Sequence, residues 1–292
     1  MKIAAIGEAM IELSMVGETP QIGIAGDTLN TAIYLKRAAP DVQVDYVTRL
    51  GGDAFSTRIA DFIAAQGVGT DAIERDPDLT CGLYGITTDA AGERTFTYWR
   101  GQSAARQVFS GPNGPSFDWM GGYDMIYLSG ISLAILPPET RDGLLHWLTT
   151  YRAQGRRVVY DSNYRPALWP DKATAQEVTR TMWHMCDIAL PSQDDEAAIF
   201  DETLEQVAAR FVGMAKTGAL KRGPEGPLCL ETGQSRSYAA APHVVDTTAA
   251  GDSFNGGYLG ALMQGAAQVD ALRAGHDLAA RVVGHRGAII PT

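Results

Sequence analysis

Residues 246–254 combine small residues with a single carboxylate in a pattern that suits phosphate chemistry. Ala249, Ala250 and Gly251 leave backbone N–H groups uncovered at the start of a predicted helix. Such a helix start carries unpaired donors and the positive end of the helix dipole, so it binds anions. Asp252 follows at once and is placed to take a proton from an alcohol. An anion site beside a base suits phosphoryl transfer to a hydroxyl, although the same residues could simply cap the helix.

A second polar cluster opens the first helical run of the chain. Gly26 allows a ligand to approach the backbone closely, and Asp27 and Asn30 present hydrogen-bonding groups at the same helix end. A turn followed by a helix cap explains this local sequence equally well.

Two arginines follow predicted strands. Tyr98 and Arg100 end a predicted hairpin and, being two residues apart, share one face of the strand. Asn163 and Arg165 follow another strand, and ligands of open α/β sheets bind beyond the carboxyl ends of strands. Arg100 and Arg165 together could hold a carboxylate, a capacity that a neutral sugar would leave unused. The alternative for Arg100 is a solvated arginine on an edge strand.

A basic, glycine-containing turn is the candidate nucleotide loop. Lys221, Gly223 and Gly226 precede a predicted strand, although a lone turn of this type is weak evidence. Nothing in the chain matches the P-loop pattern GxxxxGK[ST], and no protein-kinase motif set is present, so those two kinase classes are excluded.

An acidic run at residues 192–196 opens a further predicted helix. Solvated acids at a helix start are the usual interpretation. Asp195 and Glu196 could also organise Mg²⁺ through water, because Mg²⁺ keeps much of its hydration shell. The five histidines show no metal-ligand spacing.

Strand-like and helical runs alternate along the chain, which indicates βαβ units and a largely parallel sheet. The predicted strands are residues 3–6, 42–47, 125–128, 157–160, 188–190 and 228–230. Helical periodicity runs through residues 28–38, 57–66, 138–154, 172–185, 203–217, 254–264 and 270–285. Residues 82–100 predict a β-hairpin with its turn at 89–92, and residues 10–24 could supply further strands. These strands predict a small sheet that stands off the main body as a lid.

Composition narrows the class of protein. The 292 residues carry a formal net charge of −10, which argues against nucleic acid or anionic membranes as partners. No apolar run is long enough to span a membrane. The three cysteines are widely spaced, without CxxC or His pairing, and are expected to be reduced and buried. We therefore expect a cytoplasmic enzyme.

Over essentially its whole length the chain resembles the ribokinase/PfkB family of carbohydrate kinases. Residues 246–259 match the C-terminal signature of that family, and residues 25–30 resemble its N-terminal glycine motif. Within the family the chain is most similar to the branch that phosphorylates the sugar acid 2-keto-3-deoxygluconate. The segments that carry this likeness are residues 7–13, 26–30, 92–96, 98–100, 128–132, 163–166 and 286–291.

The resemblance implies one Rossmann-like domain over residues 1–292, with lid strands at about 10–24 and 80–100. It implies that Asp252 deprotonates the acceptor hydroxyl and that Ala249, Ala250 and Gly251 form the anion hole. The residues implied to bind the sugar acid are Gly26, Asp27, Asn30, Tyr84, Tyr98, Arg100 and Arg165. The residues implied to bind the cofactor ATP are Asn163, Ser192, Lys221, Gly223, Gly226 and His276.

The chain departs from the family pattern at two places. Many members have Gly where this chain has Ala249, so the anion hole carries an extra methyl group. Related kinases often show Asn-x-x-Glu near the Mg²⁺ site; here the Asn position is Ser192, and the carboxylate could be Asp195 or Glu196.

The expected reaction transfers a phosphoryl group from ATP, with Mg²⁺, to the 6-hydroxyl of 2-keto-3-deoxy-D-gluconate. The alternatives are a kinase for another acceptor, such as fructose, ribose or a nucleoside, and a catalytically silent sugar-acid sensor. A monovalent cation is a further candidate cofactor. Exposed lid strands also predict a homo-oligomer, with a dimer formed through the lid as the specific hypothesis.

Overall fold

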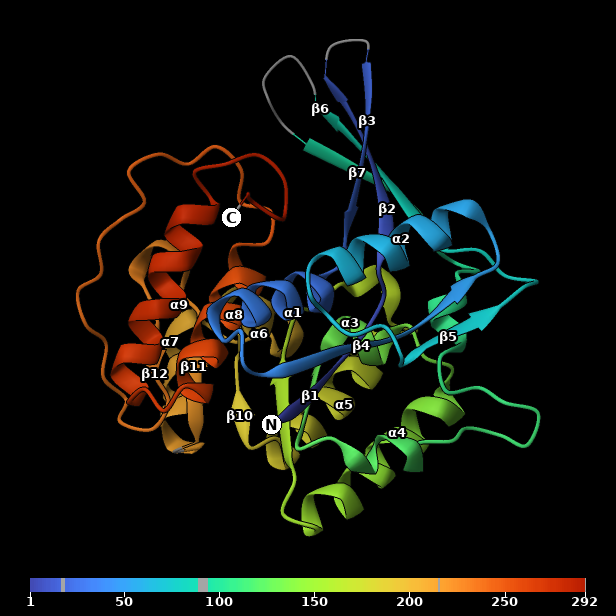
Figure 1. Cartoon of the computed structure of the whole chain (residues 1–292). Coiled ribbons are helices and arrows are strands. Elements are labelled where there is room, and N and C mark those ends of the chain that lie inside the picture. The colour runs from blue at the N-terminus through green and yellow to red at the C-terminus, as the bar shows by residue number, and fades with distance from the viewer. Residues whose placement is uncertain (17–18, 89–93, 215, 292) are drawn as a thin grey trace.

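The computed structural model describes residues 1–16, 19–88, 94–214 and 216–291. Its main sheet has the strand order β12-β11-β10-β9-β8-β1-β4-β5, and only β12 runs antiparallel to its neighbour. Figure 1 shows this sheet at the centre of the molecule. Its strands are β1 (Lys2–Ile6), β4 (Gln43–Gly51), β5 (Ile73–Asp76), β8 (Met125–Ser129), β9 (Arg157–Asp161), β10 (Ile188–Ala189), β11 (Thr217–Leu220) and β12 (Leu228–Cys229).

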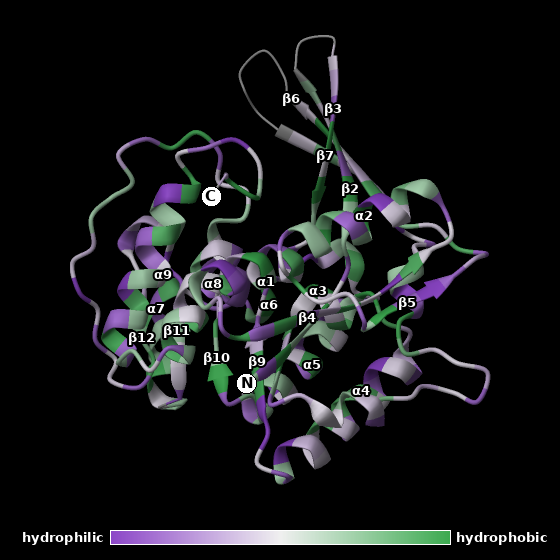
Figure 2. Cartoon of the chain, viewed as in Figure 1, coloured by the Kyte–Doolittle hydropathy of each residue, from purple (hydrophilic) through white to green (hydrophobic). Residues whose placement is uncertain are grey.

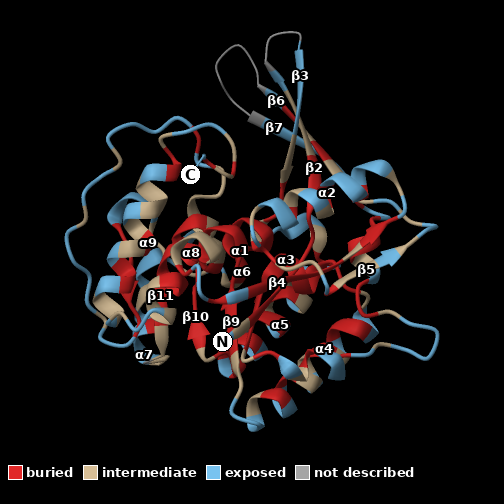
Figure 3. Ribbon diagram, viewed as in Figure 1, coloured by how far each residue is buried: buried red, intermediate tan, exposed pale blue. Residues whose placement is uncertain are grey.

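Hydrophobic side chains cover both faces of the central strands. In β8, Ile126 and Leu128 belong to one core, while Met125 and Tyr127 belong to the other. Successive side chains of a strand point to opposite faces, so a strand buried on both sides must be apolar throughout. The central strands are accordingly hydrophobic and buried along most of their length (Figures 2 and 3).

Helices cover both faces of the sheet, as the sequence predicts. One core includes side chains of α1, α2, α8 and α9, and the other includes side chains of α4, α5, α6 and α7. The helices are α1 (Asp27–Ala38), α2 (Ala54–Ala65), α3 (Gly130–Ala134), α4 (Pro138–Ala153), α5 (Lys172–Met185), α6 (Gln193–Phe200), α7 (Leu204–Met214), α8 (Ala250–Met263) and α9 (Gln268–Val282). Short 3₁₀ turns lie at Ala104–Gln107, Asp118–Gly122, Pro166–Leu168 and Gly223–Glu225.

A second sheet, the lid, has the strand order β3-β2-β6-β7 and projects from the main body in Figure 1. It consists of β2 (Met10–Val16), β3 (Thr19–Ala25), β6 (Gly82–Thr88) and β7 (Arg94–Trp99). The predicted hairpin is confirmed by the antiparallel pairing of β6 with β7, and residues 10–24 supply β2 and most of β3. The predicted turn at residues 89–92, and residue 93 of the family likeness, lie outside the described residues.

Several predicted boundaries are wrong for identifiable reasons. The helix predicted at 57–66 begins at Ala54, because the Asp53 side chain accepts hydrogen bonds from the Phe55 and Ser56 N–H groups and caps the helix. The helix predicted at 203–217 ends at Met214, and Thr217 instead opens β11, a four-residue strand that periodicity cannot resolve. The short β5 and α3 were also not predicted.

All three cysteines are free thiols: Cys186 and Cys229 are buried, and Cys81 is partly buried. Burial of Cys186 raises the pKa of its thiol to about 12, which makes it unreactive. Among the helices of the described residues, none is both long and apolar enough to cross a bilayer.

Candidate active site

The polar residues that the sequence singles out gather at the carboxyl edge of the main sheet. Strand order reverses between β1 and β8, and ligands of open α/β sheets bind at such a switch point. Glu8 follows β1, Ser129 ends β8, Asp161 ends β9 and Lys221 follows β11. Parallel strands therefore bring four polar side chains to one edge.

The amino end of α8 lies at this edge and differs from the prediction in one detail. Ala249 is the N-cap residue, in a left-handed conformation (φ 61°) that favours glycine. The Ala250 N–H donates to the Thr247 carbonyl at 3.2 Å, so it is already engaged and does not form an open anion-binding donor as predicted. The N–H groups of Ala249 and Gly251 have no partner among the described residues. These two groups are the remaining candidates for the anion hole.

Asp252 lies in the first turn of α8, as predicted for the base. Its Oδ2 accepts a hydrogen bond from Asn30 Nδ2 at 2.8 Å, which links α1 to α8. Burial, followed by the nearby charge of Asp27, raises the pKa of Asp252 to about 8. A carboxyl with a pKa near the working pH is suited to general base catalysis.

Asp27 is surrounded by donors. Its Oδ2 accepts hydrogen bonds from Ser129 Oγ at 2.5 Å and from Asn163 Nδ2 at 2.9 Å. Burial raises the pKa of Asp27, and the hydrogen bond from Ser129 opposes part of that shift. Asn163 thus lies on the predicted sugar-binding side with Asp27, rather than with the nucleotide loop, and Ser129 is a site residue that sequence reasoning did not identify.

Gly26 has a packing role that the sequence did not reveal. A Cβ added at Gly26 would lie 2.1 Å from the Glu8 carbonyl oxygen. The backbone here is extended (φ −178°), so glycine is required by the close approach of two chain segments. The atoms that crowd Gly26 in the structure therefore belong to the protein's own backbone.

Arg100 is buried, which rules out the alternative of a solvated arginine on an edge strand. It is 8% exposed and donates from Nε, at 2.8 Å, and from Nη2 to Glu8 Oε2. Glu8 is almost fully buried, and its other oxygen has no partner among the described residues. Glu8 was missed as a site residue; its position directly after the first strand is the signal that could have identified it.

The lid contributes an aromatic wall beside Arg100. The rings of Tyr84 and Tyr98 are 5.7 Å apart, and the Arg100 guanidinium lies 5.9 Å from the Tyr98 ring. Tyr98 and Arg100 thus share a face, as predicted. The Tyr84 hydroxyl donates to Glu12, and burial together with that carboxylate raises the pKa of Tyr84.

Arg165 contrasts with Arg100. Its side chain is 53% exposed and lies 3.7 Å from Asp195 Oδ1, a loose ion pair. One guanidinium nitrogen also donates to the Tyr164 carbonyl at 2.8 Å. Most of the hydrogen-bonding capacity of Arg165 remains for a ligand.

Lys221 connects the predicted nucleotide loop to α8. Its Nζ donates to Asp161 Oδ1 at 2.8 Å, and a Cβ added at Gly251 would lie 3.7 Å from that nitrogen. Ser192 pairs with Lys221 as an isolated parallel bridge.

The rest of the predicted nucleotide loop forms a turn beside α9. Gly223 (φ 54°) and Gly226 (φ 76°) both adopt conformations that favour glycine. A Cβ at Gly226 would meet the Tyr238 ring at 2.6 Å, and the His276 ring lies 4.8 Å from the same tyrosine. His276 also hydrogen-bonds the Ala239 carbonyl at 2.8 Å. The predicted ATP residues Gly226 and His276 therefore meet around Tyr238.

Glu196 is not placed to organise Mg²⁺, in contrast to the prediction. It is buried, and its two oxygens accept from Trp183 Nε1 at 3.1 Å and Arg210 Nη2 at 2.9 Å. Asp195 remains the candidate, since its side chain is partly exposed. Within the described ranges no group of three or more His, Cys, Asp or Glu side chains could hold a metal ion. Asp195 and its neighbours therefore suit only a metal ion that is held mainly by water and by phosphate oxygens.

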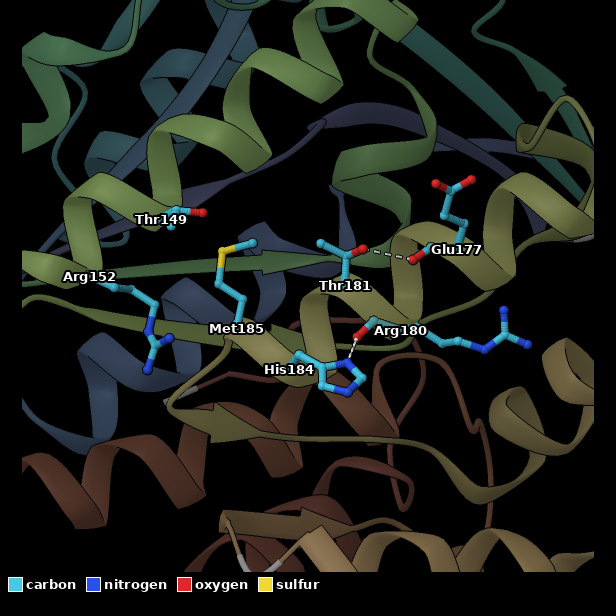
Figure 4. Close-up of a pocket in the computed structure, with 7 residues that line it drawn as sticks. All are labelled: Thr149, Arg152, Glu177, Arg180, Thr181, His184 and Met185. Carbon is cyan, nitrogen blue, oxygen red and sulfur yellow. Dashed lines mark hydrogen bonds between the residues drawn. The ribbon is translucent and has the colours of Figure 1, made fainter.

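A groove of about 550 Å³ lies elsewhere, between α4 and α5 (Figure 4). Arg152, on its wall, pairs with Asp187, which precedes β10 and so marks the amino edge of the sheet. The groove contains no predicted site residue. Its lining residues are Thr149, Arg152, Glu177, Arg180, Thr181, His184 and Met185.

Comparison with known proteins identifies the family of the chain. The chain is 42% identical over 300 residues to a 2-dehydro-3-deoxygluconokinase of Escherichia coli, covering 99% of this chain and 97% of the relative. It is 43% identical to the enzyme of the same name from Dickeya dadantii, covering 99% and 96%. A solved 2-dehydro-3-deoxygluconokinase of Thermotoga maritima shares the fold, with a TM-score of 0.84, 20% identity and coverage of 99% and 94%. The model of the pfkB family of carbohydrate kinases matches residues 1–292, and the chain belongs to that family.

Proposed function

We propose that this protein transfers the γ-phosphoryl group of ATP to the 6-hydroxyl of 2-keto-3-deoxy-D-gluconate, the sugar acid otherwise named 2-dehydro-3-deoxygluconate. One observation carries the proposal: Asp252 lies in the first turn of α8, and Lys221 Nζ lies 3.7 Å from where a Cβ of Gly251, in the same turn, would be. A base for the acceptor hydroxyl and a cation for the phosphoryl group thus lie at one helix terminus. The names of relatives at 42% and 43% identity support the choice of acceptor.

In the proposed reaction Asp252 receives the proton of the acceptor hydroxyl. A sugar hydroxyl is a far weaker acid than a carboxylic acid, so the proton moves mainly as the new O–P bond forms rather than beforehand. Asn30 holds the carboxylate of Asp252 in place. The Ala249 and Gly251 N–H groups and the Lys221 ammonium stabilise the charge on the transferring group.

The structure favours Arg165 over Arg100 as the main contact for the substrate carboxylate. The charge of Arg100 is already neutralised by the buried Glu8, whereas Arg165 is half exposed and only loosely paired. We therefore propose that Arg165 binds the carboxylate. Arg100 presents its remaining donors beside the aromatic wall of the lid.

The acidic residues suit a hydrated metal ion at the nucleotide phosphates. Asp195 is the proposed contact, through water, and a bound Mg²⁺ would neutralise negative charge on the phosphates. A monovalent cation remains a further proposal, tested by comparing activity in potassium and tetramethylammonium salts. Activity that is equal in both would reject it.

The lid suggests an interface between two copies of the chain. Five large hydrophobic side chains on its strands are at least 40% exposed: Met15, Ile22, Phe96, Tyr98 and Trp99. Exposed apolar edge strands tend to pair, so we propose a lid-to-lid dimer. Light scattering should give a dimer mass that falls on dilution more readily for Trp99→Ser than for Phe55→Ser, which changes an exposed residue of α2. A monomer mass at every concentration would reject this proposal.

We also propose that the protein works in the cytoplasm. The support is the set of free, mostly buried cysteines, which suits a reducing compartment. Fractionation of the source cells with an antibody against the chain tests this. Recovery in an oxidising compartment would contradict it.

Coupled ADP release with Mg²⁺-ATP tests the function. The acceptors are 2-keto-3-deoxygluconate, gluconate, fructose and ribose, each at several concentrations. We expect the keto-deoxy acid to have the highest kcat/KM. Preference for fructose or ribose would retain the kinase but reject the sugar-acid assignment. Calorimetric binding of the sugar acid without any ADP release would instead indicate a sensor.

A further inference from the structure

Asp161 is a buried carboxylate whose two oxygens have separate partners. Oδ1 accepts from Lys221 Nζ at 2.8 Å, and Oδ2 accepts from Asn255 Nδ2 at 2.6 Å. Its side chain is 3% exposed. Because both oxygens are engaged and covered, Asp161 does not contact a substrate itself and acts through its partners and its charge.

Lys221 is the partner that lies beside the first turn of α8. It follows β11, and its Nζ lies 3.7 Å from where a Cβ of Gly251 would be, in the first turn of α8. An ammonium group has three N–H donors, and Asp161 is its one hydrogen-bond acceptor within the described residues. Two donors therefore remain for a ligand, beside the N–H groups of the helix.

A buried hydrogen-bond network continues from Asp161 to the base. Asn255 also donates to the Tyr127 hydroxyl at 3.1 Å, and that hydroxyl lies 3.1 Å from Thr31 Oγ1. Thr31 in turn donates to the Asp252 carbonyl at 3.2 Å. The network joins the backbone of the base to the carboxylate that holds the lysine.

We propose that Asp161 is a positioning residue for phosphoryl transfer, which fixes the Lys221 ammonium against the first turn of α8. This inference rests on the proposed kinase function. A long, flexible lysine would otherwise lose its geometry, and a misplacement of about 1 Å at a reacting centre can cost about 100-fold in rate. Asp161 thereby aligns Lys221 with the Gly251 N–H and with Asp252.

The charge of Asp161 has a second effect that can be measured. The pKa of Asp252 is raised by burial, then by Asp27, and Asp161 adds to the rise. Asp161→Asn keeps the shape and one oxygen acceptor but removes this charge. The pH at which kcat/KM reaches half its maximum should therefore fall in Asp161→Asn.

A double-mutant cycle tests whether Asp161 acts through Lys221. We expect Asp161→Asn and Lys221→Met each to lower kcat about 10- to 100-fold. The double variant should be no slower than Lys221→Met alone, within about twofold, because the two residues act as one unit. Rate losses that multiply in the double variant, with an unchanged pH midpoint in Asp161→Asn, would overturn the proposal. The matched control is Asp187→Asn, which breaks the Arg152 ion pair at the other edge of the sheet and should stay within about twofold of wild type.

Two further measurements keep the test decisive. If Asp161→Asn does not fold, as judged by circular dichroism, Asp161→Glu replaces it; this variant keeps the charge but displaces Lys221, so kcat should fall while the pH midpoint stays. If the wild type phosphorylates none of the acceptors, the proposed function fails. The double-mutant cycle is then measured by calorimetry, from the Kd of a non-hydrolysable ATP analogue in complex with Mg²⁺. Additive effects on that Kd would overturn the role of Asp161.

Discussion

The carboxyl edge of the sheet and the lid present their polar residues in different ways. At the edge, Asp252, Asp161 and Lys221 are held by hydrogen bonds between helices and strands that pack on a core with both faces covered. On the lid, Tyr98 and Trp99 are exposed on a sheet of four strands. A group that must meet a transition state needs a fixed position, whereas a group that selects a ligand can stay exposed to receive it. We infer that the core performs the transfer and that the lid and adjoining loops choose the acceptor.

The largest expected effect comes from the base at the core. Asp252→Asn should lower kcat at least about 100-fold with a modest change in KM for the sugar acid, because the variant cannot accept the proton in the transition state. Steady-state kinetics on both substrates measures this. Turnover close to wild type would contradict the assignment of the base.

The next largest effect concerns Arg165, the arginine proposed to bind the substrate carboxylate. Arg165→Met should lower kcat/KM for the sugar acid about 10- to 100-fold more than for fructose, since a charged hydrogen bond to the carboxylate is lost. Kinetics on both acceptors with a single enzyme preparation measures the ratio. Equal losses on the two acceptors would make Arg165 structural.

A smaller effect is expected in the pH dependence of kcat/KM. The pKa of Asp252 is raised from 3.8 to about 8, so the base form is scarce at pH 7 and predominates above pH 8. We expect kcat/KM to rise about tenfold from pH 7 to its plateau. Stability should change in the opposite direction: the contribution of this carboxyl to folding is present below pH 3.8 and is lost as the pH rises through 8. A flat profile from pH 6 to 9 would contradict this account.

The smallest expected effect concerns the N-cap of α8. Ala249→Gly should stabilise the protein by at most about 1 kcal/mol, because glycine adopts the left-handed conformation without strain. Thermal melting measures this, with Ala250→Gly as the control in a helical conformation, where a loss is expected. A lower melting temperature for Ala249→Gly would show that the methyl group contributes packing that outweighs the strain.

The sequence predicted those elements whose formation depends mainly on residues close together in the chain. The small residues before Asp252 identified a helix start, and alternating apolar runs identified most of the parallel strands. Periodicity could not resolve β11, since four residues containing a glycine carry too little pattern. It also continued the preceding helix through Thr217, which opens that strand.

The partners of charged side chains could not be predicted, because they depend on which strands become neighbours. Arg100 and Glu8 are 92 residues apart and meet only after the lid packs on the sheet. Glu196 was predicted as a candidate for the metal ion because its partner Arg210 lies on the next helix, where the local sequence does not reveal the pairing. The sequence therefore predicted the types of residue at the site better than their pairing.

The most direct test of this division between core and periphery is kcat/KM for 2-keto-3-deoxygluconate and fructose in the wild type, Asp252→Asn and Arg165→Met. We predict that Asp252→Asn loses activity on both acceptors by the same factor, and that Arg165→Met loses activity mainly on the acid. A selective loss in Asp252→Asn, or an equal loss in Arg165→Met, would contradict the division between a core that transfers and a periphery that selects.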